Sequence, residues 1–387
     1  MSEETTTATD SEVLVDLKGV KVHFPIKSGI IFDRTVGHVY AVDGVDMQVR
    51  RGETYGLVGE SGCGKSTLGK AILNLETPTE GSIVFDGVDI ASLKGETLRR
   101  KRQDLQMVFQ DPMSSLDPRQ SVESLLVEGM RSHGLDQDDQ KTNARLRELL
   151  AAVGLPASSL RKYPHEFSGG QRQRIGIARA LSVDPKLIVA DEPVSALDVS
   201  VQAQVLNLLE EIQDEFGLTY LVVAHDLAVV RHISDRIGVM YLGGLVEESE
   251  AGELYEHPLH PYTRALMSAV PVPDPEVEDQ REQILLTGDL PSPSKPPSGC
   301  RFHTRCPWRQ ETRCDDERPQ LRVVEVDGVS AGHRVACHWA EQIASGEIQR
   351  HEVSAEFVEA ANRGRVDVDS IPRDQAEDLG YGGDGSL

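Results

Sequence analysis

The chain has 387 residues, which is enough for two domains, and its hydrophobic content of 39% is enough for a real core. Its 63 acidic residues against 40 basic ones give a formal net charge of −23, which argues against a general affinity for nucleic acid or anionic lipid. Apolar runs fall short of the roughly 18 residues that span a bilayer, and the polar, acidic N-terminus is unlike a secretory signal, so we expect a cytosolic chain that reaches a membrane only through a partner.

The basic residues are unevenly divided, with 11 lysines against 29 arginines. Together with the large negative charge, this composition suggests a halophilic protein, adapted to a high-salt cytoplasm where ions screen the repulsion between carboxylates. The alternative is an ordinary acidic protein with two acidic tails. Composition alone does not decide between them.

The N-terminal part of the chain is rich in strand signals. Residues 1–12 are polar and acidic and predict a flexible arm. From residue 13 to about residue 60, short β-rich runs alternate with glycine-containing turns, as expected of strands. A helix is expected from Lys65 to Leu75, and two more strands at the segments GSIVFDG and LQMVF.

Helical and strand-like segments interleave further along the chain. Apolar residues at helical spacing predict a helix from Asn143 to Val153. The segments KLIVADEP and TYLVVAHD are short apolar runs that end in polar residues, which suits buried parallel strands with chemistry at their carboxyl ends. We therefore expect one α/β domain over residues 13–270.

The C-terminal part differs in composition. Prolines are frequent in residues 271–298, which favours a stiff, extended connector, and a small Cys-containing module follows to about residue 340. Connector and module together make a second expected region, residues 271–340. Residues 341–387 are acidic and poor in apolar residues, so we expect disorder there.

The segment GESGCGKST follows a strand-like run and precedes a helix-like one. It fits the pattern G-x-x-x-x-G-K-[ST], in which backbone N–H groups and a helix N-terminus converge on phosphate oxygens. Lys65 would neutralise β- and γ-phosphate charge, and the Ser66 hydroxyl would ligate Mg²⁺. The predicted nucleotide-binding loop comprises Gly59, Glu60, Ser61, Gly62, Cys63, Gly64, Lys65, Ser66 and Thr67.

Cys63 lies inside this loop, near Lys65 and a helix N-terminus, and both of these lower the pKa of a thiol. A regulatory thiol and a small space-filling residue both suit the position. We favour the space-filling role.

The segment LIVADE, residues 187–192, has the pattern of a buried strand that ends in two acids. Asp191 at the strand tip can hold the coordination shell of Mg²⁺, and Glu192 is placed to orient and deprotonate a water that attacks the γ-phosphate. A core strand that ends in solvated acids fits the same six residues. The phosphate loop upstream favours the catalytic interpretation.

The segment FSGGQRQRIGIARAL contains Ser168, a good N-cap, followed by two glycines and a basic helix. The small residues leave the helix N-terminus open, which makes a second anion site. Because the single phosphate loop already cradles one nucleotide, this second site makes sense if it serves the nucleotide of another subunit. An ordinary capped helix is the alternative.

In their order along the chain, these motifs resemble those of the ATP-binding-cassette (ABC) ATPases, over roughly residues 13–250. The matching positions are residues 59–67 as Walker A, Gln110 as the Q-loop, FSGGQ as the signature, LIVADE as Walker B, SALD (195–198) as the D-loop and His225 as the switch histidine. Phe167 stands where many members have Leu. No catalytic position departs from the pattern, so the resemblance implies a competent ATPase.

The resemblance implies an α/β P-loop NTPase fold with an antiparallel β subdomain, a RecA-like core, a helical subdomain around residues 111–165 and a small Cys-rich C-terminal module. It also implies a head-to-tail dimer, in which the signature of one subunit closes on ATP held by the other and the D-loop contributes Asp198. The signature residues are Ser168, Gly169, Gly170 and Gln171.

Single residues also take roles from this resemblance. His225 would hydrogen-bond the γ-phosphate, and Gln110 would contact the attacking water. The ligands implied for Mg²⁺ are Ser66, Gln110 and Asp191. The adenine would stack on an upstream aromatic residue, for which Tyr40 is the candidate and Phe32 the competitor.

Two segments narrow the resemblance to the peptide-importer branch, the oligopeptide/dipeptide (and nickel) uptake ATPases. They are QDPMSSLDPRQSV after Gln110 and residues 257–275, with the sequence His260-Pro261-Tyr262. This branch implies an ATPase subunit at the cytoplasmic face of the cell membrane, with a second ABC ATPase subunit (a paralogue or itself), two membrane permeases and an extracytoplasmic substrate-binding protein. Peptides are the implied cargo, and nickel or oligosaccharides are alternatives.

A soluble ABC ATPase of DNA repair or translation is a more distant alternative. Such proteins typically carry two cassettes, long insertions or a basic surface, whereas this chain has one cassette and an acidic balance. We therefore expect no nucleic-acid partner.

Four of the five cysteines, Cys300, Cys306, Cys314 and Cys337, are separated by 5, 7 and 22 residues. In a cytosolic chain such clustering suggests a metal rather than disulfides, and the lack of C-x₂₋₄-C pairs disfavours zinc. Four thiolates suit an iron–sulfur cluster, which the resemblance also implies, so we expect [4Fe–4S]. Zinc and unoccupied thiols are the alternatives. The histidines that could substitute as ligands are His303, His333 and His338.

Overall fold

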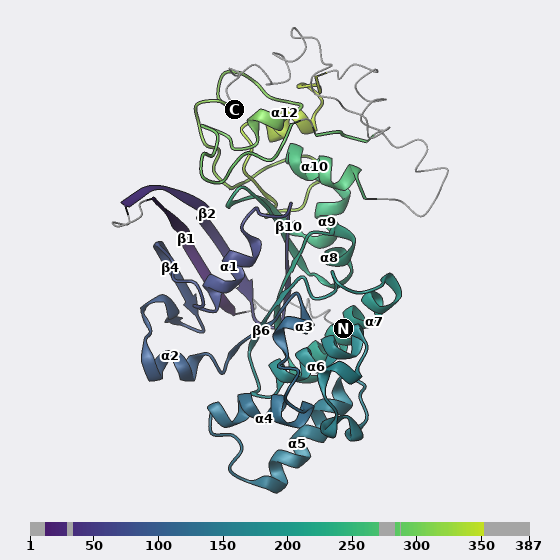
Figure 1. Ribbon diagram of the computed structural model, residues 1–387. Coiled ribbons are helices and arrows are strands. Elements are labelled where there is room, and N and C mark those ends of the chain that lie inside the picture. Colours follow the sequence, from purple (N-terminus) through teal and green to yellow (C-terminus); the bar gives the residue numbers. More distant parts are fainter. Residues whose placement is uncertain (1–11, 29–33, 271–282, 287, 352–387) are drawn as a thin grey trace, which may run out of the picture. The chain divides into compact units, whose positions relative to one another are not determined.

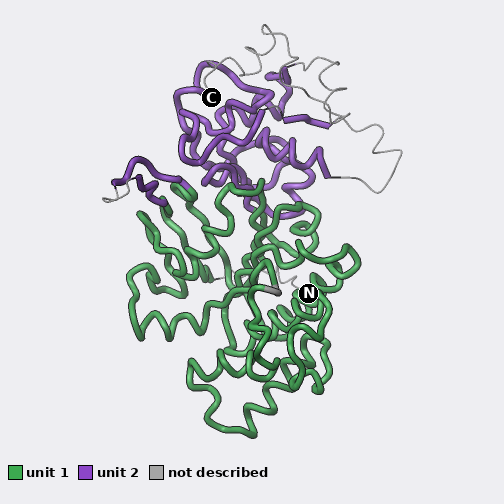
Figure 2. The backbone as a smooth tube through the Cα atoms, in the orientation of Figure 1, with its two compact units in different colours: residues 1–23, 41–237 green, residues 24–40, 238–387 purple. Residues whose placement is uncertain are grey.

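The computed structural model describes residues 12–28, 34–270, 283–286 and 288–351. The chain divides into two compact units (Figure 2): residues 1–23 and 41–237 form unit 1, and residues 24–40 and 238–387 form unit 2. This division lies at residue 237 and in the hairpin between the first two strands, whereas the composition changes near residue 270. Three of the expected segments lie wholly or largely outside the described residues, as does Phe32: they are the N-terminal arm, the first part of the proline-rich connector and the C-terminal tail.

An antiparallel sheet has the strand order β2-β1-β4-β5. Its strands are β1 (Val13–Ser28), β2 (Arg34–Arg50), β4 (Glu80–Phe85) and β5 (Val88–Asp89). Leu17 of β1 is buried and pairs with buried Ile83 of β4, so one face of the sheet is core. Gly81 has φ +87°, and a Cβ there would lie 2.5 Å from the carbonyl oxygen of Gly19, where the β1–β4 register shifts. The antiparallel sheet predicted from the sequence is confirmed.

Four parallel strands form the core of unit 1, in the order β3-β8-β7-β6. They are β3 (Thr54–Val58), β8 (Thr219–Ala224), β7 (Leu187–Asp191) and β6 (Leu105–Val108). Every residue of β3, β7 and β8 is buried, as expected of a parallel sheet covered on both faces. In this register the carboxyl ends of the strands meet at one edge, because Val58 pairs with Ala224 and Val108 pairs with Ala190.

The helices of unit 1 follow in chain order (Figure 1). They are α1 (Lys65–Ile72), α2 (Gly95–Lys101), α3 (Pro112–Ser115), α4 (Val122–Ser132), α5 (Asp139–Ala152), α6 (Gly169–Leu181), α7 (Val199–Phe216) and α8 (Leu227–Ile233), with 3₁₀ turns at Ile90–Ser92, Ala157–Arg161 and Pro164–Glu166. Helices α3, α4 and α5 pack against α6. Gly56 of β3 allows α8 to pack closely, because a Cβ there would lie 2.1 Å from Val230.

Unit 2 has the strand order β11-β12-β10-β9. Its elements are β9 (Arg236–Tyr241, which begins at the end of unit 1), β10 (Gly244–Glu250), β11 (Arg322–Val323), β12 (Arg334–Val335), α9 (Ala251–Glu256), α10 (Pro261–Ser268), α12 (Ala340–Ala344) and a 3₁₀ turn at His303–Arg305. One small core contains Leu259, Val324, Val335 and Ala340. Among the residues that the structure describes, no helix combines the length and the apolar character that crossing a bilayer requires.

Candidate nucleotide-binding site

Residues 59–64 of the glycine-rich segment connect β3 to α1 at the carboxyl edge of the parallel strands, and residues 65–67 form the first turn of α1. Gly64 is the N-cap of α1 with φ +108°, a left-handed conformation that suits glycine, and it offers no side chain to cap the helix. The first N–H groups of α1 therefore have no side-chain acceptor and are available to phosphate oxygens.

Lys65 is only 4% exposed, and backbone carbonyl groups of the same loop accept hydrogen bonds from its amino group. Its Nζ donates to the carbonyl oxygens of Gly59 at 2.7 Å and Glu60 at 3.0 Å. The Sγ of Cys63 lies 3.8 Å from the same Nζ. Burial nevertheless raises the pKa of Cys63, against the opposing charge of Lys65. The lowered pKa expected from the sequence is therefore wrong, because desolvation of the thiolate outweighs the nearby cation.

Ser66 and Asp191 meet across the edge of the sheet. Ser66 Oγ donates to Asp191 Oδ1 at 2.8 Å, which joins the first turn of α1 to the end of β7. Burial raises the pKa of Asp191, and the hydrogen bond from Ser66 opposes this shift. A hydroxyl and a carboxylate are hard oxygen ligands, which is the donor set that Mg²⁺ takes beside a phosphate.

Glu192 lies one residue beyond β7, and the side chains of the other two predicted catalytic residues lie next to its carboxylate. Its Oε2 accepts a hydrogen bond from Gln110 Nε2 at 2.8 Å, and His225 Nδ1 lies 3.4 Å from the same oxygen. Its backbone has φ +45° and is held by a bond from its N–H to the Val223 carbonyl at 2.8 Å. The three residues predicted to act on the attacking water and the γ-phosphate are thus brought together.

The signature segment starts α6 with a reciprocal cap. The Ser168 hydroxyl accepts the N–H of Gln171, and the Gln171 side chain accepts the N–H of Ser168. Ser168 and Gly169 are exposed, whereas Gly170 is buried. A Cβ on Gly170 would lie 2.5 Å from Val201, so the first turn of α7 packs directly on the signature. A Cβ on Gly169 would lie 3.4 Å from Leu197, which precedes Asp198 in the loop before α7. Val201 is a supporting residue that no sequence motif reveals.

Tyr40 belongs to unit 2, at a half-buried position of β2. Its N–H donates to the Pro293 carbonyl at 3.0 Å, and its ring centroid lies 6.4 Å from that of His38. The choice between Tyr40 and Phe32 as the adenine-stacking residue stays a prediction.

The four C-terminal cysteines form no disulfide. Burial raises the pKa of Cys300 to about 11 and that of Cys337 to about 12, and it raises the pKa of Cys306 as well; the other thiolates add to each shift. Within the described part of the chain, however, no three Cys, His, Asp or Glu side chains converge closely enough to hold a metal ion. The described residues therefore show no assembled ligand set for the expected iron–sulfur cluster, which stays a prediction.

The three histidines proposed as substitute ligands have other partners. His303 Nδ1 lies 2.8 Å from the Cys300 carbonyl, and His338 Nε2 lies 2.8 Å from the Glu317 carbonyl. His333 Nε2 lies 2.7 Å from the Glu247 carboxylate.

Comparison with known proteins identifies two family segments. Residues 42–195 match the ABC transporter family, and residues 246–314 match the family described as oligopeptide/dipeptide transporter, C-terminal region. The chain is 54% identical to the oligopeptide transport ATP-binding protein AppF of Bacillus subtilis, over 86% of this chain and 99% of AppF. It is 50% identical to OppF of Salmonella typhimurium, which carries the same description, over 84% of this chain and 96% of OppF.

Solved structures show the same fold. The ATP-binding cassette MJ0796, a dimer in a post-hydrolysis state bound to ADP and Pi, is similar with a TM-score of 0.55 and 30% identity, over 61% of this chain and 98% of that chain. The protein cbiO1 of Clostridium perfringens is similar with a TM-score of 0.55 and 26% identity, over 63% of this chain and 91% of that chain. These matches confirm the ABC ATPase fold and the family resemblance predicted from the motifs, whereas the Cys-rich C-terminal module stays a prediction. The chain therefore belongs to the ABC transporter ATPases, in the family of oligopeptide transport ATP-binding proteins.

Proposed function

We propose that the chain is the ATP-hydrolysing subunit of an importer of di- and oligopeptides. The observation that carries this proposal is the convergence of Gln110 and His225 on one oxygen of Glu192, at the sheet edge that also carries the Ser66–Asp191 pair. The relatives described as oligopeptide transport proteins support the cargo class. Nickel or oligosaccharides remain the alternative cargoes for the same machinery.

Each residue of the site has a role in this proposal. Lys65 would exchange its two loop carbonyls for β- and γ-phosphate oxygens, and the N–H groups of the first turn of α1 would bind the same phosphates. Ser66, Asp191 and Gln110 would hold Mg²⁺, which supplies charge neutralisation between the phosphates. Glu192 would take the proton of the attacking water, and His225 would hydrogen-bond the γ-phosphate.

A complete site needs a second cassette, either a paralogue or a second copy of this chain. Ser168 and Gly169 are exposed at the start of α6, where an anion from another subunit can reach them. We assign the four signature residues to the nucleotide of that partner, with Asp198 at the junction. The fold shared with a cassette solved as a dimer supports this arrangement.

The remaining partners follow from the family. They are two membrane permeases and an extracytoplasmic substrate-binding protein, which would place this subunit at the cytoplasmic face of the cell membrane. The acidic composition supports the expectation of no nucleic-acid partner. Copurification of permeases with the tagged chain favours this reading, whereas ATPase activity stimulated by nucleic acid would favour the soluble alternative.

Glu192→Gln tests the catalytic assignment. Because a general base contributes on the order of 10²–10⁴-fold to rate, the variant is expected to lose ATPase activity by that factor and to lose ATP-driven uptake of a labelled peptide in vesicles that contain the permeases, while ATP binding is retained. Glu211→Gln, at an exposed position on α7, is the matched control and should behave like the original protein. Near-normal turnover of the Glu192 variant would refute the assignment.

We further propose that residues 271–340 form the expected Cys-containing module and that its four cysteines hold a [4Fe–4S] cluster. Backbone N–H groups two residues further along the chain donate to Cys300, Cys306 and Cys337, from Phe302, Trp308 and Trp339 respectively. Such donors stabilise thiolate charge and are typical of cluster ligands. Anaerobically purified protein is expected to contain iron and acid-labile sulfide and to absorb visible light. Lack of all three would remove the cluster.

A further inference from the structure

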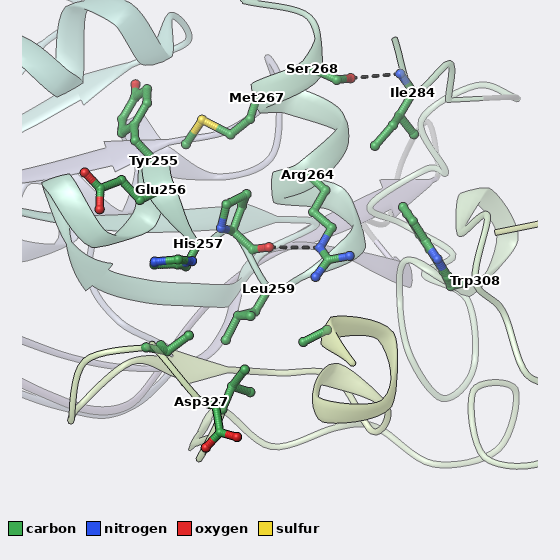
Figure 3. A pocket seen from close by; sticks show the side chains of 14 residues that line it. Tyr255, Glu256, His257, Leu259, Arg264, Met267, Ser268, Ile284, Trp308 and Asp327 are labelled. Atoms are coloured by element: carbon green, nitrogen blue, oxygen red, sulfur yellow. Dashed lines mark hydrogen bonds between the residues drawn. The ribbon is translucent and has the colours of Figure 1, made fainter. Parts of the chain in front are cut away.

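Unit 2 contains a cavity that none of the proposed roles uses (Figure 3). Its volume is about 530 Å³, which lies within the range of about 300–1,000 Å³ typical of small-molecule sites. The loop between α9 and α10, helix α10, Trp308 and the segment around Asp327 line it. Apolar side chains, among them Leu259 and Met267, form much of the wall.

The loop that forms one wall is fixed by a buried carboxylate. Glu247 of β10 accepts the N–H of Leu259 at 2.7 Å and the N–H of His260 at 3.0 Å. His333 Nε2 lies 2.7 Å from the same carboxylate, and both side chains are fully buried. The wall is therefore held by charged hydrogen bonds inside the protein, so the cavity is preorganised rather than a gap between loose loops.

Arg264 of α10 presents its guanidinium to this cavity in a fixed orientation. Its Nε donates to the Pro258 carbonyl at 2.9 Å, and its central carbon lies 5.7 Å from the centre of the Trp308 ring. Among the described residues, its two terminal nitrogens have no hydrogen-bond or ion-pair partner. Arginine stays protonated, so the cavity contains a half-buried cation with unused donors, in a chain of net charge −23.

The charged side chains of the lining favour a ligand with a single carboxylate over a phosphate. Besides Arg264 and the imidazole of His257, the ionisable side chains of the lining are the carboxylates of Glu256 and Asp327, and both residues are exposed. Inorganic phosphate is a mixture of monoanion and dianion near neutral pH, and its dianion would be repelled by these acids more strongly than a single carboxylate would be. A single carboxylate fits the planar fork of Arg264, and an amino group elsewhere on the ligand would be attracted by the acids.

We propose that this cavity binds a short hydrophobic peptide or amino acid, with its α-carboxylate on Arg264 and an aliphatic side chain against Leu259 and Met267. The site lies wholly in unit 2, and its recognition chemistry does not depend on the cargo of the transporter. It adds a second class of ligand to a chain whose other site binds ATP.

Tryptophan fluorescence of the full-length protein tests the proposal, since the chain has only two tryptophans and Trp308 lines the cavity. In a Trp339→Phe background, titration with the dipeptide Leu-Leu is expected to give a saturable change in Trp308 emission. Leu-Leu amide, which lacks the carboxylate, is expected to bind about 10- to 100-fold more weakly, because hydrogen bonds between charged groups contribute about that factor. Inorganic phosphate is expected to give no saturable change.

Two variants locate the site. Arg264→Gln is expected to weaken Leu-Leu binding to the level of the amide, and Ala344→Phe, which keeps the arginine but fills the cavity, is expected to abolish binding. Arg100→Gln removes an exposed arginine outside the cavity and is the matched control.

Thermal unfolding and ATP binding, measured on each protein, separate loss of the fold and loss of the ATP site from loss of this site. Equal affinity for Leu-Leu and its amide, binding unchanged by Ala344→Phe in a folded protein, or no saturable change at millimolar Leu-Leu would each overturn the proposal.

Discussion

Glu192 combines a left-handed backbone with two contacts on one carboxylate oxygen. A non-glycine residue at φ +45° costs about 1–3 kcal/mol, which the surrounding structure must compensate. Here the N–H bond to Val223 and the hydrogen bond from Ser195 Oγ to the Glu192 carbonyl, at 3.1 Å, hold the backbone. The fold itself therefore orients the side chain of the proposed base.

Two glycines of α6 give a matched pair of substitutions. Gly170→Ala would place a Cβ 2.5 Å from the β-branched side chain of Val201, so overpacking of about 1–3 kcal/mol is expected. The melting temperature should fall, and ATPase activity should fall with it because the signature shifts against the first turn of α7. Gly176→Ala is the control, since nothing lies within 4 Å of its Cβ and alanine favours a helix by about 1 kcal/mol. Equal melting temperatures for the two variants would contradict this packing argument.

At the scale of elements, hydrophobic pattern predicted the site-bearing strands well. The two apolar runs that end in polar residues are β7 and β8, and their carboxyl ends carry Asp191 and His225 as expected. Helix ends were less predictable. The helix expected from Asn143 begins at Asp139 because Asp138 caps it, and the helix expected to reach Leu75 ends at Ile72, just before Asn74 at φ +50°.

Other features of the site depend on packing between distant segments, which a local pattern does not contain. The bond between Gln110 and Glu192 spans 82 residues, and the contact of Gly170 with Val201 joins two helices. The raised pKa of Cys63 depends on burial, which outweighs its sequence neighbour Lys65. Motif spacing therefore indicates which residues take part in the proposed chemistry. Only the tertiary structure shows which of them are hydrogen-bonded to each other or closely packed.

At the scale of the whole molecule, two electrostatic effects give opposite salt dependences of stability: attraction within ion pairs, and repulsion among the excess carboxylates. Lys186 Nζ lies 2.6 Å from Asp86 Oδ2, and Arg51 Nη2 lies 2.8 Å from Asp86 Oδ1. Because dissolved ions screen charges near the surface, the attraction within such ion pairs weakens as salt rises. The formal net charge of −23 has the opposite salt dependence, because screening relieves repulsion among the excess carboxylates. Since exposed pairs contribute only about 0–1 kcal/mol each, we propose that the global term dominates.

The halophilic hypothesis then predicts a stability that increases with salt. Raising KCl from 0.1 M to above 1 M shortens the screening length from about 10 Å to about 3 Å, so the melting temperature and the ATPase rate should both rise. Differential scanning calorimetry and a phosphate-release assay across the same KCl series measure the two. A fold and an activity that survive dilution into low salt unchanged would identify an ordinary acidic protein.

The buried ammonium of Lys65, bonded to the carbonyls of Gly59 and Glu60, has a consequence for turnover. A cation left alone in a protein interior would favour local unfolding each time spent ADP departs. If Lys65 binds the phosphates as proposed, its Nζ would return to these two carbonyls when ADP leaves, so the buried charge would keep oxygen partners. In the proposed cycle, exchange of ADP for ATP would then change only the oxygen partners of one nitrogen and would need no local unfolding.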